Sequence, residues 1–157
     1  MSKLEVEAIV NGSVIDHIPA GQGINILKHF RMLDTQRTGA KITVGFNLPS
    51  KTMGLKDLIK VENKRLSQDQ VNQLAILAPG ATVNIIENSQ VVTKYRPEIP
   101  KHISNVYRCP NSNCITNFEK VSSTFYVLRK ASGLKLKCKY CEKIFDKEVV
   151  SQTLNTR

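Results

Sequence analysis

Four cysteines in two close pairs constrain this chain more than any other feature of its sequence. CPNSNC occupies residues 109–114 and CKYC occupies residues 138–141, and the 157-residue chain contains no other cysteine. Pairs with C-x4-C and C-x2-C spacing are typical of a structural zinc site, in which each short loop presents two thiolates to one ion. The sequence therefore predicts one zinc ion per chain, bound by Cys109, Cys114, Cys138 and Cys141.

Two disulfides, unrelated buried thiols or a redox-active CKYC motif are the alternatives to zinc. The opening residues MSKLEVEAIV show no secretory signal, and no apolar run approaches the roughly 18 residues that span a bilayer. We therefore expect a soluble, cytoplasmic protein whose thiols stay reduced. CKYC also lacks the strand-then-helix setting of a redox motif. Zinc is favoured, and four thiolates would leave no open position for an activated water, so the ion would be structural.

The residues after position 100 predict a small antiparallel β module around this zinc. SSTFYVLRK (122–130) and LKLKC (134–138) are typical of a hairpin, and a last short strand is expected around IFDKEVV (144–150). Fewer than sixty residues bury little core unaided. Metal binding, worth about 10–16 kcal/mol in small zinc modules, would then dominate the stability of this part.

The first hundred residues predict a different, α+β architecture. Strands are expected at 4–10, 13–18, 41–48, 56–63, 81–88 and 89–95, with a hairpin turn at Asn11-Gly12. Helices are expected at 24–33 and 67–78, the second opened by a capping box of Ser67 and Gln70. This order is the split βαβ pattern of a ferredoxin-like antiparallel sheet with two helices.

A segment with two prolines, YRPEIPKHI (95–103), is typical of a boundary between the two parts. It predicts a first domain at 1–97 and a zinc-binding domain at 98–157. Charge differs between the parts: residues 1–100 carry 12 Lys/Arg against 9 Asp/Glu, and residues 101–157 carry 11 against 4. A basic zinc module is compatible with a nucleic acid and equally with an acidic protein partner, so composition leaves both readings open.

An enzymatic reading of the first domain finds little support in the sequence. Asp16 and His17 are adjacent, and adjacent residues of a regular strand point to opposite faces, which argues against an acid–base pair. No GxSxG, Walker A or GxGxxG motif is present. Three lysines lie on expected strands, namely Lys56, Lys60 and Lys94. They either converge on a phosphate or form a solvated face.

Eight segments spread along both domains resemble one known family. They are VEAI (6–9), VIDHIPAG (14–21), NLPS (47–50), KDLIK (56–60), LSQDQVNQLA (66–75), APGATVN (78–84), CPNSNCI (109–115) and LKCKYCEK (136–143). In order and in their cysteine spacing, these segments resemble the regulatory chain of aspartate carbamoyltransferase.

The resemblance implies a non-catalytic regulatory subunit in pyrimidine biosynthesis. In that family the chain pairs with itself through its first domain and docks through its zinc domain on separate catalytic chains. Three regulatory dimers bridge two catalytic trimers. CTP, helped by UTP, inhibits the complex and ATP activates it. Neither a nucleic acid nor a membrane is expected as a partner.

The resemblance also implies which residues bind nucleotide. The backbone of residues 6–9 would hold the base, Asp16 would reach the ribose, and Lys60 would contact base and ribose. Lys94 and His17 would approach the phosphates. The full set is Val6, Glu7, Ala8, Ile9, Asp16, His17, Lys60, Asn84, Ile86, Val91 and Lys94.

The positions that face the catalytic chain in the family lie beside the cysteines. Asn111 and Asn113 lie inside the C-x4-C loop, and Lys139 and Lys143 flank the second pair. The resemblance therefore implies that zinc shapes a docking surface.

Overall fold

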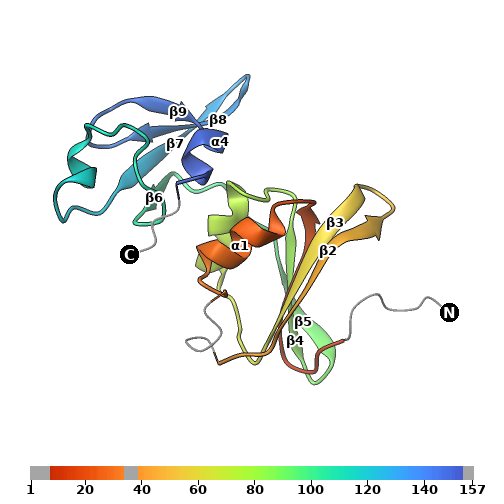
Figure 1. The fold of residues 1–157 in the computed structure, drawn as a ribbon. Coiled ribbons are helices and arrows are strands. Elements are labelled where there is room, and N and C mark those ends of the chain that lie inside the picture. The colour runs from red at the N-terminus through yellow and green to blue at the C-terminus, as the bar shows by residue number, and fades with distance from the viewer. Residues whose placement is uncertain (1–7, 34–38, 154–157) are drawn as a thin grey trace. The chain divides into compact units, whose positions relative to one another are not determined.

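The chain divides into two compact units, with the boundary between Glu98 and Ile99 (Figure 1). The structure is a computed structural model that describes residues 8–33 and 39–153. Within these ranges no helix is long and apolar enough to cross a bilayer.

The first unit is built on one five-stranded sheet. Its strands are β1 (Gly12–Pro19), β2 (Ile42–Ser50), β3 (Gly54–Glu62), β4 (Thr82–Glu87) and β5 (Gln90–Tyr95). They lie in the order β2-β3-β1-β4-β5, and every neighbouring pair is antiparallel. The first four strands have the order of a split βαβ fold, and β5 folds back along β4. The predicted α+β, ferredoxin-like class is confirmed.

Short helices cover one face of this sheet (Figure 1). They are α1 (Gly23–His29) and α3 (Gln68–Asn72), which continues as a 3-10 turn, η1 (Gln73–Ala75). Because successive side chains of a strand point to opposite faces, Ile15, Ile59 and Val83 point toward the helices, where all three are fully buried. The opposite face of the sheet carries both polar and apolar side chains, among them Lys60, Asn84 and Val14.

The helix ends show why α1 is shorter than predicted and how α3 begins. Arg31 takes a left-handed φ of 56°, and the Met32 N–H bonds the Leu27 carbonyl, which closes α1 with a Schellman motif. At the start of α3 the predicted capping box is confirmed: Ser67 Oγ accepts from the Gln70 N–H at 3.2 Å, and Gln70 Oε1 accepts from the Ser67 N–H at 2.9 Å.

The predicted hairpin at Asn11-Gly12 is wrong. Residues 4–7 of its first strand lie outside the described residues, and residues 8–10 are not in a strand. β1 is a central strand whose two edges pair with β3 and β4, so no edge remains for a preceding strand. Gly12 instead is the first residue of β1 and has a φ of 141°, and a Cβ there would lie 2.1 Å from the Val61 carbonyl oxygen. The glycine permits a close backbone approach.

The second unit is a four-stranded antiparallel sheet with little else. Its strands β6 (His102–Ser104), β7 (Thr124–Lys130), β8 (Gly133–Cys138) and β9 (Ile144–Asp146) lie in that order. A 3-10 turn, η2 (Ile115–Asn117), follows the first cysteine pair. The segment predicted as one last strand divides into β9 and a short helix, α4 (Lys147–Ser151). Val150 is the fully buried residue of this helix.

Candidate functional site

The four cysteine sulfurs of the second unit form one cluster. All four Sγ atoms lie within 4.8 Å of one another, and Cys109–Cys141 and Cys114–Cys138 are each separated by 3.7 Å. Tetrahedral zinc with Zn–S bonds of about 2.3 Å places its sulfurs about 3.8 Å apart. A disulfide needs about 2.05 Å, and all four cysteines are free. The donor set therefore fits one structural zinc ion and not two disulfides.

Backbone turns hold each cysteine pair in place. In the first loop, Asn117 Nδ2 donates to the Cys109 carbonyl at 3.2 Å and to the Asn111 carbonyl at 2.8 Å. In the second, the Cys138 N–H donates to the Lys143 carbonyl, and Glu142 turns the chain with a φ of 64°. Each pair is thus presented by a loop that its own hydrogen bonds define.

The thiols differ in how readily they ionise. Burial raises the pKa of Cys109 and of Cys138. Burial also opposes ionisation of Cys141, but hydrogen bonds from the Lys143 backbone and the Asn111 side chain lower its pKa to about 7. Zinc binds thiolates, so filling the site releases protons, and the ion supplies the positive charge that buried sulfurs need.

In the first unit, a cavity of about 280 Å³ opens on the sheet face opposite the helices. Six residues of the predicted nucleotide site line it: Ala8, Ile9, Asp16, Lys60, Asn84 and Ile86. Three further lining residues escaped prediction from sequence: Val14, Leu58 and Ser89. Val14 and Leu58 lie two residues from predicted members of the same strands, so strand alternation was a usable signal for both.

Strand register explains why distant residues converge here. Lys60 on β3 lies opposite Val14 on β1, Val14 lies opposite Asn84 on β4, and Asn84 lies opposite Lys94 on β5. Directly opposed residues project from the same face of an antiparallel sheet. The sheet therefore sets two lysines and an amide in one row across four strands, and Lys60 is only 8% exposed.

Asp16 and His17 lie at an irregularity that the sequence did not reveal. A β-bulge spans residues 15–18, and His17 has a φ of 59°, so the alternation argument against their lying together fails at this point. His17 Nδ1 lies 3.2 Å from Thr82 Oγ1 and 4.0 Å from Asp16 Oδ2. Asp16 Oδ1 forms an ion pair with Lys56 Nζ at 2.9 Å. Lys56 thus belongs to the surroundings of this cavity.

Of the other five predicted nucleotide residues, three are described and do not line the cavity, and two are not described. Val6 and Glu7 are outside the described residues. His17, Lys94 and Val91 do not line the cavity, and Val91 is 57% exposed on the edge strand β5.

The predicted docking residues all lie on the two cysteine loops. Asn111 is half-buried, and its Oδ1 accepts from the Asn113 N–H at 3.1 Å, so it also shapes the loop. Asn113, Lys139 and Lys143 are exposed, and Lys139 Nζ lies 5.8 Å from the centre of the Tyr140 ring. The zinc cluster thus carries polar groups on its outer surface.

Two protein-family models match this chain in the order of its two units. The allosteric domain of the aspartate carbamoyltransferase regulatory chain matches residues 4–98, and the metal binding domain of the same chain matches residues 101–151. The chain belongs to the aspartate carbamoyltransferase regulatory chain family.

Relatives of the same description cover nearly the whole sequence. The aspartate carbamoyltransferase regulatory chain of Tolumonas auensis is 61% identical over 150 residues, which are 96% of each chain. Those of Aeromonas hydrophila and Escherichia coli O139:H28 are each 56% identical, over 96% and 95% of both chains. The predicted family is confirmed, and with it a non-catalytic regulatory subunit that carries an allosteric domain and a structural zinc domain.

Proposed function

We propose that this subunit binds CTP, UTP and ATP on its first unit and transmits their effect to aspartate carbamoyltransferase catalytic chains through its zinc unit. CTP, with UTP, would inhibit and ATP would activate. The observation that carries the proposal is the row of Lys60, Asn84 and Lys94 across one sheet face, beside the Asp16 carboxylate.

The chemistry of this face suits a nucleoside triphosphate. Lys94 supplies positive charge for the phosphates, Lys60 offers donors to the base and ribose, and Asp16 is an acceptor for ribose hydroxyls. Lys56 already pairs with Asp16, so ribose binding has to share that carboxylate. His17 adds a ring nitrogen near Thr82 at the edge of the same region. The backbone of residues 6–9 is proposed to read the base.

Opposite effects from one site require two states of the complex. A nucleotide shifts the balance between them only through its differential affinity for the two. We propose that triphosphate contacts are common to CTP and ATP, and that the base contacts differ between the states.

The zinc unit is proposed to dock on the catalytic chain through its cysteine loops. Asn113, Lys139 and Lys143 would meet polar and acidic groups of that partner, while Asn111 holds the loop that presents them. The first unit would form the self-dimer, and three such dimers would bridge two catalytic trimers. We place this complex in the cytoplasm, where thiols stay reduced and available to zinc.

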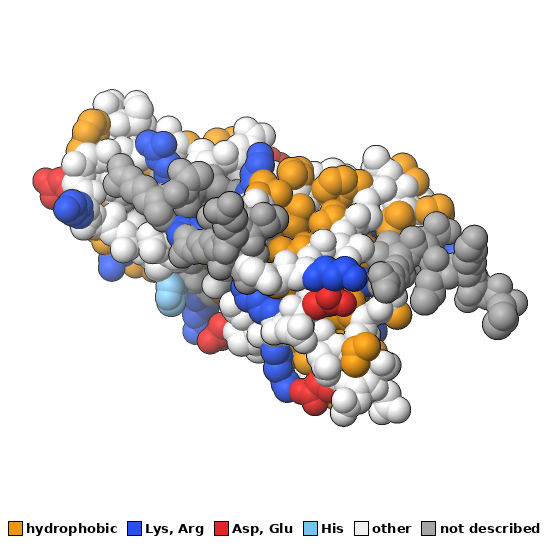
Figure 2. All heavy atoms as spheres, turned by 60° about the horizontal axis from the view of Figure 1, so that its bottom comes forward, with side chains coloured by type: hydrophobic (Ala, Val, Ile, Leu, Met, Phe, Trp, Pro, Cys, Tyr) orange, Lys and Arg blue, Asp and Glu red, His pale blue; other side chains and the backbone are white. Residues whose placement is uncertain are grey.

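A nucleic-acid partner is less well supported. Four thiolates on one zinc ion contribute about −2, which lowers the net charge of residues 101–157 from +7 to about +5. On the face drawn in Figure 2, basic side chains of the described residues lie in separate patches among acidic and uncharged ones. A continuous basic track is the usual electrostatic signature of nucleic-acid binding.

Reconstitution tests the proposal. Purified chain is mixed with aspartate carbamoyltransferase catalytic trimers, and the products are separated by sedimentation. A larger complex whose activity falls with CTP and rises with ATP is expected. A complex of that size whose activity does not change with either nucleotide would refute the allosteric part of the proposal. Failure to assemble would refute its docking part.

A further inference from the structure

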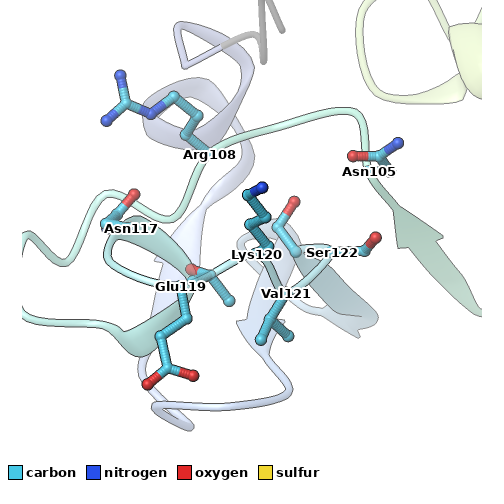
Figure 3. A pocket seen from close by; sticks show the side chains of 9 residues that line it. Asn105, Arg108, Asn117, Glu119, Lys120, Val121 and Ser122 are labelled. Atoms are coloured by element: carbon cyan, nitrogen blue, oxygen red, sulfur yellow. The ribbon is translucent and has the colours of Figure 1, made fainter.

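The second unit contains a polar cavity that belongs to neither proposed site. Its volume is about 300 Å³. Its walls are the segment after β6, the turn η2 and the loop that leads into β7 (Figure 3). The lining residues are Asn105, Arg108, Thr116, Asn117, Glu119, Lys120, Val121, Ser122 and Ser123.

The cavity carries two cations from two different wall segments. Arg108 follows β6 and Lys120 lies in the loop before β7, and neither forms an ion pair with any described residue. Glu119 is the only acidic residue among those that line the cavity. In Figure 3 the side chains of Lys120 and Ser122 lie on one side of the loop, whereas Glu119 and Val121 lie on the other. The Glu119 carboxylate therefore lies on the other side of the loop, and the side that bears Lys120 and Ser122 keeps its positive charge.

Backbone hydrogen bonds hold the two walls in a defined arrangement. The Asn105 N–H donates to the Ser123 carbonyl at 2.7 Å, and the Ser123 hydroxyl donates to the Tyr107 carbonyl. The Arg108 N–H donates to the Thr153 carbonyl at 2.6 Å, and the Thr153 hydroxyl donates back to the Arg108 carbonyl at 2.6 Å. Because these bonds hold the backbone of both walls, the freedom lost on ligand binding is mainly that of the exposed Arg108 and Lys120 side chains.

One wall of the cavity is continuous with the first cysteine loop. The Thr116 hydroxyl donates to Cys114 Sγ at 3.2 Å, and the Asn117 amide donates to the Cys109 carbonyl at 3.2 Å. Zinc binding at these cysteines thus fixes η2, and η2 fixes this wall. The Ser122 hydroxyl, by contrast, forms no hydrogen bond within the described part of the chain and stays available as a donor.

We propose that this cavity binds a small oxyanion of the phosphate class between the Lys120 ammonium and the Ser122 hydroxyl. The exposed Arg108 side chain points away from both in Figure 3 and would turn toward the bound ion. A guanidinium presents paired N–H donors that match two oxygens of a phosphate, and an ammonium adds a point charge. Because η2 forms a wall, binding depends on zinc. The inference is independent of the nucleotide site, which lies in the other unit.

An NMR titration of the zinc-loaded full chain with inorganic phosphate tests the proposal. Ionic strength is held constant with chloride. Saturable shifts are expected at the amides of Asn105, Arg108 and residues 120–123. Arg108→Gln and Lys120→Gln should each weaken this binding about tenfold or more, since each removes a charge-assisted contact. Arg129→Gln and Lys130→Gln remove the same charges from exposed positions of β7 outside the cavity and should leave the affinity unchanged.

Several results would overturn the proposal. Equal affinity in the wild type and all four variants would, as would phosphate shifts confined to the first unit. Acetate that bound as tightly as phosphate would rule out the phosphate class. A zinc-free sample that kept the saturable shifts would refute the dependence on metal.

Discussion

The two units of this chain reach a stable fold by different means. In the first, fifteen buried apolar residues of the described part form one cluster. In the second, the described apolar residues that are buried, cysteines aside, are few: Ile103, Tyr107, Phe125, Leu136 and Val150. The metal cluster supplies the rest of the interior. The comparison separates a first unit with an apolar core that needs no metal from a second unit whose interior is built around a metal site.

Removing zinc should produce the largest difference between the units. Cys114→Ala, or treatment with a mercurial reagent, removes binding worth about 10–16 kcal/mol in small zinc modules and should unfold the second unit. The first unit has its own core and should stay folded and keep binding nucleotide. Amide hydrogen exchange resolves both units in one sample.

Loss of protection in β1–β5 together with β6–β9 would show that the units fold as one. Calorimetry on the same zinc-free sample measures CTP binding, and sedimentation measures assembly with catalytic trimers. A zinc-free chain that still assembled and still transmitted the CTP signal would contradict the docking role of the cysteine cluster.

Gly12→Ala should destabilise the first unit alone. The new Cβ would lie 2.1 Å from the Val61 carbonyl oxygen, at a φ of 141°, so β1 and β3 would have to separate. We expect a loss of about 3 kcal/mol, from strain and overpacking together. Gly80→Ala is the matched control, because nothing lies within 4 Å of its added Cβ. Urea unfolding followed by hydrogen exchange measures both; equal midpoints for the two variants would contradict the account of β1.

Lys60→Ala and Lys94→Ala should each weaken CTP and ATP binding while leaving zinc bound. A lost charge-assisted contact is worth about 1.5–3 kcal/mol, so affinity should fall about tenfold or more. Lys51→Ala removes an equal charge from an exposed turn of the same unit that does not line the cavity. Calorimetry measures all three variants. If Lys51→Ala lost as much affinity as the others, general charge and not the row of residues would explain binding.

Asn113→Ala should act on docking more weakly than metal removal does. Asn113 is exposed, and its side chain is proposed to contact the partner, so about 1 kcal/mol of assembly free energy should be lost.

Asn117→Ala, in contrast, removes the amide that bonds the Cys109 and Asn111 carbonyls, and should speed zinc release to a chelator. Equal zinc release rates for both variants would show that Asn117 does not support the loop.

The smallest expected effect is a pH dependence of the first unit. Burial lowers the pKa of His29 from its ordinary 6.5. A hydrogen bond with Gln73 at 2.8 Å acts in the opposite direction but is the smaller effect. The unfolded chain then binds a proton more readily than the folded one, so stability is complete above pH 6.5 and declines as pH falls below it. Urea midpoints between about pH 8 and 5 should show this slope in the wild type and a shallower one in His29→Gln. An identical slope in both would assign it to other groups.

Local patterns in the sequence determined a large part of this protein. Cysteine spacing identified the zinc site because its ligands come as short loops, and strand alternation with the Ser67 capping box identified most elements of the first unit. The fold class followed from the order of those elements. Residues 56–60 could be placed on a strand, and the family motif supplied the proposed binding role of Lys60.

Tertiary structure alone decided how those elements come together. β1 became a central strand, which changed Gly12 from a turn residue to a point of close approach. The bulge at residues 15–18 turns His17 toward Thr82, and no local sequence pattern predicts a bulge. Asp57 is 1% exposed, and its carboxylate accepts hydrogen bonds from the N–H groups of Gly21, Gly23 and Asn47, which only the fold brings to it.

The physical reason is the range of the interactions involved. Helix caps, strand alternation and metal loops depend on residues within a few positions of one another, so a sequence displays them directly. Strand order, bulges and the row of Lys60, Asn84 and Lys94 depend on pairing between segments tens of residues apart, which is chosen by the burial of the whole core.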